Sequence, residues 1–314
     1  NTLKNGNIPI FEPGLQEIVN KNVQDKRLNF TTELGDAICN SDVVFIAVGT
    51  PSDKNGNVDI SYLESAVKNI SIHLKKYTVI VVDIRGMGSS DKPFNGYDKK
   101  TMAKDIFELI QKLGIKKPHV LGHDIGGMVA SSFAFNYPHA LDKLIVMDGA
   151  HPSEAMREMR LLPMPGTFED KIDNKFPFLW WMAFNQVKEL PEKLLKGRFR
   201  YLLDWLFSYV MLDDAKMSDF EREVAAHHYN QPENIRASNA WYQAFEQDIK
   251  DMNTYPNLQM PVLGMASESS YEFMKQGLPY IAKNVEVIKV EASGHYFNEE
   301  NPQAVIDALL HFQN

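Results

Sequence analysis

The sequence has little cysteine, no excess of positive charge and no long apolar run. Its single cysteine among 314 residues, Cys39, excludes a disulfide framework and a cysteine-rich zinc site. A formal net charge of −8 argues against nucleic acid as a partner. Because no apolar run is long enough to cross a bilayer and no signal-peptide pattern opens the chain, we expect a cytoplasmic protein with no membrane partner.

Histidine pairs come closest to the spacing of a metal site, and neither pair fits one. His119 and His123 lie in a strand-to-turn segment that does not place both on one helix face, and His227 and His228 point apart. We therefore expect no metal. The glycine-rich stretch "RGMGSS" lacks the lysine and the following helix of a phosphate-binding loop.

Short apolar runs alternate with amphipathic stretches along most of the chain. This alternation predicts an α/β fold, with a mostly parallel sheet and flanking helices. Strands are expected at residues 28–31, 77–83, 118–122, 143–148, 260–266 and 285–291, and residues 42–51 are expected to form a strand that runs into a Gly-Thr-Pro loop. Helices are expected at residues 14–26, 61–74, 101–113, 128–137 and 302–312, the third with Thr101 as its N-cap.

Residues 151–256 interrupt this alternation. They carry almost no strand pattern and contain aromatic, helical stretches such as "FPFLWWMAF" and "FRYLLDWLFSYVML". A helical block inserted into a sheet protein often forms a lid. We therefore divide the chain into a first segment of residues 1–76, a sheet core of residues 77–150 and 257–314, and a helical cap of residues 151–256.

A charged residue stands at the tip of a very short turn in "LGHDIGGMVA". Asp124 lies between a predicted strand and a predicted helix, flanked by Gly122, Gly126 and Gly127. Small residues around one reactive side chain are typical of a nucleophile elbow, where a Cβ would clash with the neighbouring strand and helix. A carboxylate is already ionised at neutral pH, so it suits attack on a saturated carbon of an epoxide or a carbon–halogen bond.

An ester formed on Asp124 would need a histidine to activate water and a second carboxylate to orient that histidine. His295 follows the last predicted strand in "ASGHYF", and Asp148 ends the strand after the elbow helix in "VMDGAHP". Glu268, after the next strand, is the rival acid.

From about Tyr77 to its end, the chain resembles the α/β-hydrolase fold in its epoxide hydrolase and dehalogenase branch. The resemblance rests on "DIRGMGSSDKP", "GHDIGG", the helical cap and "SGH". It implies an Asp124–His295–Asp148 triad, a small apolar substrate and an alkyl-enzyme ester. The placement in "VMDGAHP" favours Asp148 as the acid.

The residues around the elbow and in the cap favour epoxide chemistry within this branch. Haloalkane dehalogenases usually have Trp after the nucleophile, whereas this chain has Ile125, and the arginines of fluoroacetate dehalogenases are absent there. The resemblance makes Tyr242 a proton donor to the opening epoxide. It places a second donor near Trp180 and Trp181, whose indoles are poorer proton sources. With Trp241, these two indoles are our candidate substrate-binding residues.

The first 76 residues resemble nucleotide-sugar dehydrogenases of the UDP-glucose 6-dehydrogenase type. The resemblance rests on "GNIPIFEPGLQEIV" and "RLNFTTELGDAICNSDVVFIAVGTP". That family's glycine-rich pyrophosphate turn is missing from this stretch, so we expect no dinucleotide and no other cofactor. The sequence looks like a chimera of two truncated families joined within "YTVIV", arisen by recombination or by an assembly error.

The join replaces the first strands of the hydrolase and its His-Gly-x-Pro oxyanion loop. Ile125 is expected to supply one oxyanion N–H, as elbow geometry requires. The second must come from Gly49 or Thr50, because Pro51 has no N–H. We therefore expect weak or absent turnover.

Several functions remain open from the sequence. The first choice is an epoxide hydrolase. The alternative is a non-catalytic hybrid that holds a small apolar ligand under the cap, or a haloalkane dehalogenase. A nucleotide-sugar dehydrogenase fragment ranks behind these. The substrate and the oligomeric state stay open as well.

Overall fold

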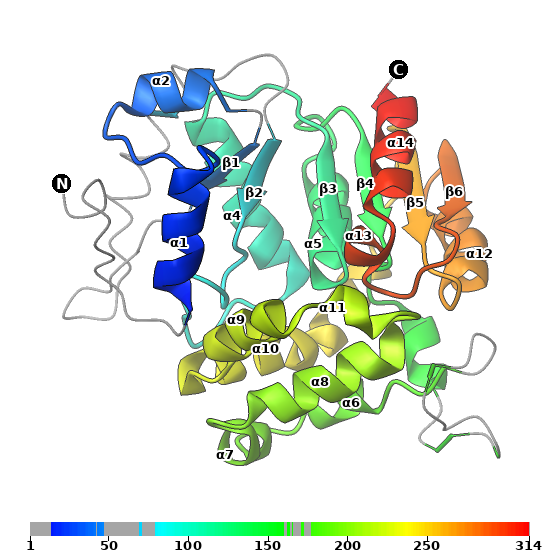
Figure 1. The fold of residues 1–314 in the computed structure, drawn as a ribbon. Helices are drawn as coiled ribbons and strands as arrows, with labels where there is room; N and C mark the ends of the chain where they lie inside the picture. Colours follow the sequence, from blue (N-terminus) through cyan, green and yellow to red (C-terminus); the bar gives the residue numbers. More distant parts are fainter. Residues whose placement is uncertain are drawn as a thin grey trace.

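The computed structural model describes residues 14–41, 43–46, 69–70, 79–159, 162–163, 165, 171–172 and 177–313. A parallel sheet lies between helices, and a layer of further helices runs across one end of it (Figure 1). The predicted fold class, an α/β protein with a mostly parallel sheet, is confirmed. Within the described part, no helix is both long and apolar enough to cross a bilayer.

The main sheet contains four parallel strands in the order β3-β4-β5-β6. Their bounds are Val120–His123 for β3, Leu144–Met147 for β4, Val262–Ala266 for β5 and Val285–Lys289 for β6. The helices on its two faces are α4 (Lys99–Lys112), α5 (Ile125–Asn136), α12 (Tyr271–Ile281), α13 (Phe297–Glu300) and α14 (Pro302–Gln313).

The two central strands of the main sheet, β4 and β5, are buried on both faces, as expected for strands with helices on both sides. Along β4, Leu144 and Val146 belong to the apolar cluster formed with α5 and α12. Ile145 and Met147, which alternate with them, belong to the cluster formed with α13 and α14. The two-residue period of the strand therefore supplies one half of its side chains to each layer.

A second, two-stranded parallel sheet precedes the main one. Strand β1 (Val43–Ile46) pairs with β2 (Val79–Val82). Helices α1 (Leu15–Gln24) and α2 (Leu34–Cys39) come before it in the chain. Among the described strands, no pairing joins the two sheets. The sequence predicts a buried strand at 77–83, but Val79 and Val81 of β2 are exposed, because they alternate with Ile80, which packs against the buried cluster.

Two further local predictions are wrong. Residues 28–31 form no strand, because the backbone N–H of Leu28 donates to Asn22 O at 3.0 Å in the turn that ends α1. Helix α4 is capped by Asp98 rather than Thr101, since the Asp98 side chain accepts the Thr101 N–H at 2.8 Å. The helix expected at 61–74 lies outside the described residues except at 69–70, which are helical.

The helical cap lies across the end of the sheet that carries Asp124 and Asp148 (Figure 1). An apolar cluster that includes Phe199, Leu203 and Ile235 holds its helices together. The cap contains η2 (Glu154–Glu158), α6 (Trp180–Phe184), α7 (Leu190–Leu195), α8 (Phe199–Val210), η3 (Asp214–Lys216), α9 (Asp219–Tyr229), α10 (Pro232–Gln243) and α11 (Phe245–Met252).

A fully buried ion pair fastens the cap to the core. Lys99, at the start of α4, donates from Nζ to Asp248 Oδ2 at 2.9 Å and to the Trp241 carbonyl at 2.8 Å. Asp248 Oδ1 accepts the Lys99 backbone N–H at 2.7 Å, and neither side chain has any exposed surface. Burial lowers the pKa of Lys99 and raises the pKa of Asp248, and their mutual attraction opposes both shifts.

We predict that Asp248→Asn lowers the free energy of unfolding by about 3–5 kcal/mol, because it leaves the Lys99 ammonium buried without a counter-charge. Chemical denaturation followed by fluorescence measures this change. Glu246→Gln, on the same helix but in exposed ion pairs, is the matched control and should change stability far less. Equal effects of the two substitutions would contradict the anchoring role.

Candidate active site

Asp124 occupies a strained turn between β3 and α5. Its backbone angles are φ 50° and ψ −120°, a combination that residues with a Cβ seldom adopt. Its N–H donates to Met147 O at 3.0 Å, which ties the turn to the neighbouring strand. A Cβ on Gly122 would overlap the Gly126 carbonyl, and one on Gly149 would overlap the Asp124 carbonyl. The turn is therefore built from a close approach of three backbone segments.

His295 and Asp148 lie beside Asp124, although they are far from it in the sequence. His295 Nδ1 is 2.9 Å from Asp148 Oδ2, and its Nε2 is 3.9 Å from Asp124 Oδ2. The other oxygen of Asp148 accepts the Ser267 N–H at 3.0 Å and the Ser270 hydroxyl. Glu268 instead faces Lys289, with 3.6 Å between its Oε1 and Lys289 Nζ.

The charged forms of Asp124, Asp148 and His295 stabilise one another. Burial lowers the pKa of His295, but the close contacts with Asp124 and Asp148 and the charges of both carboxylates raise it to about 10. Burial raises the pKa of each carboxyl, and the contact with His295 outweighs burial and leaves both below their usual value. At neutral pH the resting site therefore holds two carboxylates and one imidazolium.

A second histidine, His123, contacts the backbone of His295 but is itself uncharged. His123 Nε2 lies 2.9 Å from the His295 carbonyl oxygen, and the two rings are 4.6 Å apart. Burial and the neighbouring His295 lower the pKa of His123 to about 4, so it is neutral and donates to that carbonyl. His119, the other histidine of the pair considered for a metal site, has its Nε2 at 3.1 Å from Asp142 Oδ2. No cluster of three or more His, Cys, Asp or Glu side chains among the described residues could hold a metal ion.

Asp124, Asp148 and His295 line a cavity of about 470 Å³ beneath the cap, and most of its wall is apolar. The candidate Trp181 and Trp241 line it as well. Trp241 Nε1 donates to the Arg85 carbonyl at 3.1 Å, so its N–H is already used. Trp180 is not part of the lining and packs edge-on against Trp181 and Trp205, because its side chain belongs to the core of the cap.

Among the described residues, three tyrosines line this cavity, and the sequence indicates only one of them, Tyr242. Tyr229 is the last residue of α9, and Tyr296 follows His295. Burial, followed by the charge of Asp124, raises the pKa of Tyr229 to about 12. Burial and Asp124 also raise the pKa of Tyr242, while a hydrogen bond with Asn185 opposes the shift. No motif marks Tyr229, because it stands in "HHYN" away from the stretch expected to carry the second donor.

The oxyanion candidates are only partly described. Ile125 begins α5 directly after Asp124 and lines the cavity. Gly49 and Thr50 lie outside the described residues.

Comparison with known proteins identifies the family that this geometry represents. The model of the alpha/beta hydrolase fold matches residues 55–302. The chain belongs to the α/β-hydrolase fold family.

Its relatives include epoxide hydrolases. The chain is 30% identical over 253 residues to the soluble epoxide hydrolase of Corynebacterium sp. (strain C12), which covers 76% of this chain and 81% of that protein. The crystal structure of Cfl2 from Burkholderia cenocepacia matches with a TM-score of 0.67 and 27% identity, covering 87% of this chain and 88% of that one. The epoxide hydrolase CorEH, at 23% identity and a TM-score of 0.66, shares the fold over 87% of this chain and 91% of its own.

The N-terminal segment matches a second family. The model of the UDP-glucose/GDP-mannose dehydrogenase family, NAD binding domain, matches residues 1–85. UDP-glucose 6-dehydrogenase TuaD of Bacillus subtilis (strain 168) is 54% identical over 80 residues, which are 26% of this chain and 17% of that protein. Both resemblances are therefore confirmed. The two matched ranges overlap over residues 55–85, and a chimera of the two families is a plausible origin of this pattern.

We predict that Asp148→Asn lowers the pKa of His295 from about 10, because one of the two carboxylates that stabilise the imidazolium is lost. NMR titration of the His295 ring in the absence of substrate measures this value. Glu268→Gln, the control at the rival position, should leave it unchanged. A fall in the second variant but not in the first would reverse the assignment of the acid.

Proposed function

We propose that this chain hydrolyses a small apolar epoxide through an ester on Asp124, with His295 and Asp148 completing the triad. The observation that carries the proposal is a carboxylate on the elbow, with His295 Nε2 at 3.9 Å and a mostly apolar cavity above it. The similarity to epoxide hydrolases supports the substrate class.

In the first half-reaction, an Asp124 oxygen attacks an epoxide carbon and the ring C–O bond breaks. The product is a neutral ester and an alkoxide, which takes a proton from a cap hydroxyl. Ester formation removes the negative charge of Asp124, which helps to hold the pKa of His295 at about 10. The pKa of His295 therefore falls, and the imidazolium proton restores the tyrosine hydroxyl.

In the second half-reaction, the now neutral His295 takes a proton from water while the hydroxide attacks the ester carbonyl carbon. The Ile125 N–H would stabilise the resulting oxyanion. The C–O bond to the substrate breaks, the departing oxygen takes the remaining proton of the attacking water from the intermediate's hydroxyl, and Asp124 returns as a carboxylate beside an imidazolium. One epoxide and one water have then become one diol, and the resting charges are restored.

This chain lacks the His-Gly-x-Pro oxyanion loop of the family, and that difference should slow hydrolysis of the ester. Loss of one oxyanion donor costs about 10²–10³-fold in rate in a well-studied protease. We therefore expect turnover below that of an intact epoxide hydrolase unless Gly49 or Thr50 supplies the second N–H.

Tyrosine hydroxyls in the cap favour an epoxide over an alkyl halide. An opening epoxide needs a proton donor, whereas a departing halide needs a cradle of N–H groups. A tyrosine hydroxyl is protonated at neutral pH, and burial and Asp124 raise the pKa of Tyr242 and Tyr229 further, so both hold a proton that can be donated. The residue after the nucleophile, Ile125, has no N–H in its side chain to hold a halide. The indole N–H of Trp241 already donates a hydrogen bond to the Arg85 carbonyl.

We predict that His295→Gln lets an alkyl adduct accumulate on Asp124, because ester formation needs no base and ester hydrolysis does. Incubation with styrene oxide and other small epoxides, followed by peptide mass spectrometry, locates the adduct. Asp124→Asn should form none. An adduct on another residue, or diol formation without any adduct in this variant, would refute the mechanism.

We predict that Tyr242→Phe and Tyr229→Phe each slow ester formation by about 10²-fold, the lower range for loss of an acid catalyst. Rapid-quench measurement of the adduct in the His295→Gln background isolates this step. Tyr201→Phe, at a tyrosine that is 78% exposed, is the control and should change nothing. If only Tyr242→Phe slows the step, Tyr229 is not a donor.

A further inference from the structure

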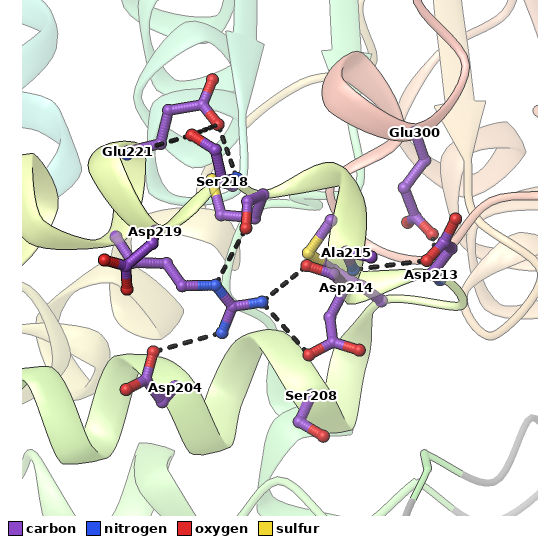
Figure 2. Close-up of polar contacts among 12 residues, drawn as sticks. Asp204, Ser208, Asp213, Asp214, Ala215, Ser218, Asp219, Glu221 and Glu300 are labelled. Carbon is purple, nitrogen blue, oxygen red and sulfur yellow. Dashed lines mark hydrogen bonds and ion pairs between the residues drawn. The ribbon is translucent and has the colours of Figure 1, made fainter.

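One carboxylate joins the loop of His295 to the cap. Glu300, the last residue of α13, accepts the Gly294 N–H on Oε2 at 2.7 Å and the Asp213 N–H on Oε1 at 2.8 Å. Gly294 immediately precedes His295, and Asp213 lies in the cap between α8 and η3. Figure 2 shows the Glu300 side chain reaching down beside Asp213.

The same cap segment contacts the loop a second time. The His295 N–H donates to the carbonyl of Val210, the last residue of α8, at 2.9 Å. Gly294 is packed so closely against Val210 and Met211 that a Cβ there would overlap the Val210 carbonyl. The backbone N–H groups of Gly294 and His295 are thus both held by contacts that lead into the cap.

The cap side of this connection is itself firmly held. Arg222 of α9 donates to the Met217 carbonyl at 2.9 Å, to the Asp214 carbonyl at 2.6 Å and to Asp204 Oδ1 at 3.1 Å. Its side chain is only 12% exposed, so these bonds are partly shielded from water. Asp204 and Asp214, labelled in Figure 2, both accept hydrogen bonds from Arg222, and Asp214 directly follows Asp213 in the chain.

We propose that Glu300 is a positioning residue, which sets the place of His295 Nε2 by fixing its loop to the cap. This inference rests on the proposed function for its kinetic consequences. His295 must reach a water molecule that attacks the ester on Asp124, and a displacement of about 1 Å at such a site can cost 10²-fold in rate. The nucleophilic attack of Asp124 does not depend on that position.

Glu300→Gln tests the proposal, because an amide has one acceptor oxygen where two N–H donors need one each. We expect ester hydrolysis to slow by about 10–100-fold and ester formation to change less than about twofold. The alkyl adduct on Asp124 should therefore accumulate, measured by rapid quench and mass spectrometry. A merely structural role would slow both steps together.

Glu299→Gln is the matched control. It removes the same charge one residue earlier in α13, from an exposed side chain whose carboxylate has no hydrogen bond to either N–H group held by Glu300. It should leave both steps as they are. Wild-type ester hydrolysis in Glu300→Gln, or equal slowing in the two variants, would overturn the proposal.

A measurement without substrate separates this proposal from the proposed function. Hydrogen exchange followed by NMR should show the Gly294 and Asp213 amides protected in the wild-type chain, and exchanging about tenfold faster or more in Glu300→Gln. If no epoxide reacts but this protection is seen and then lost, the proposed function fails and the positioning role stands. Unprotected amides in the wild-type chain would overturn the proposal, even if Glu300→Gln did not fold.

Discussion

The close approach of three backbone segments at Asp124 is the constraint on which the rest of the site depends. The carbonyl of Asp124 lies against Gly149, and the N–H of Asp124 donates to the carbonyl of Met147 in the neighbouring strand. That contact brings the end of β4, and hence Asp148, next to the elbow. The positive φ of Asp148, 46°, shows that the second carboxylate is held in an unusual backbone conformation as well. Surrounding packing must hold both strained residues.

The close approach of Asp124 and Asp148 places two negative charges next to each other, and His295 balances them. Two carboxylates beneath an apolar cap would repel each other, and the imidazolium between them removes most of that cost. The arrangement also makes the basicity of His295 depend on the state of Asp124. An ester on Asp124 would turn a histidine that is charged at rest into one that is neutral when water must be deprotonated. In the proposed mechanism, this change lets His295 act in both half-reactions.

Local patterns made much of this predictable from the sequence. Asp124, Asp148 and His295 each follow an apolar strand, and parallel strands bring their carboxyl ends to one edge. The α/β alternation likewise predicted the main sheet. Helix α12 gave no such signal, because Pro279 lies inside it.

Contacts between distant segments could not be read from the sequence. Lys99 and Asp248 are 149 positions apart, and nothing in either neighbourhood marks them as partners. Glu300 bonds Asp213 across 87 positions, and its own stretch "NEEN" is typical of an exposed turn. Tyr229 reaches the cavity only because α9 ends there. These residues act through tertiary packing, which a single sequence does not encode in any local pattern.

The packing of the first sheet explains how segments of two families can share one chain. Ile38, Val44 and Ile70, all within the stretch that resembles dehydrogenases, are buried against Leu113, which directly follows α4. Ile80 of β2 and Leu109 of α4 pack against the same cluster. Both families place parallel strands beneath helices, so an apolar strand such as β2 meets the demands of either. Along β2, Ile80 joins this shared cluster while Val79 and Val81 remain exposed, so residues matched by the two family models pack in one apolar contact.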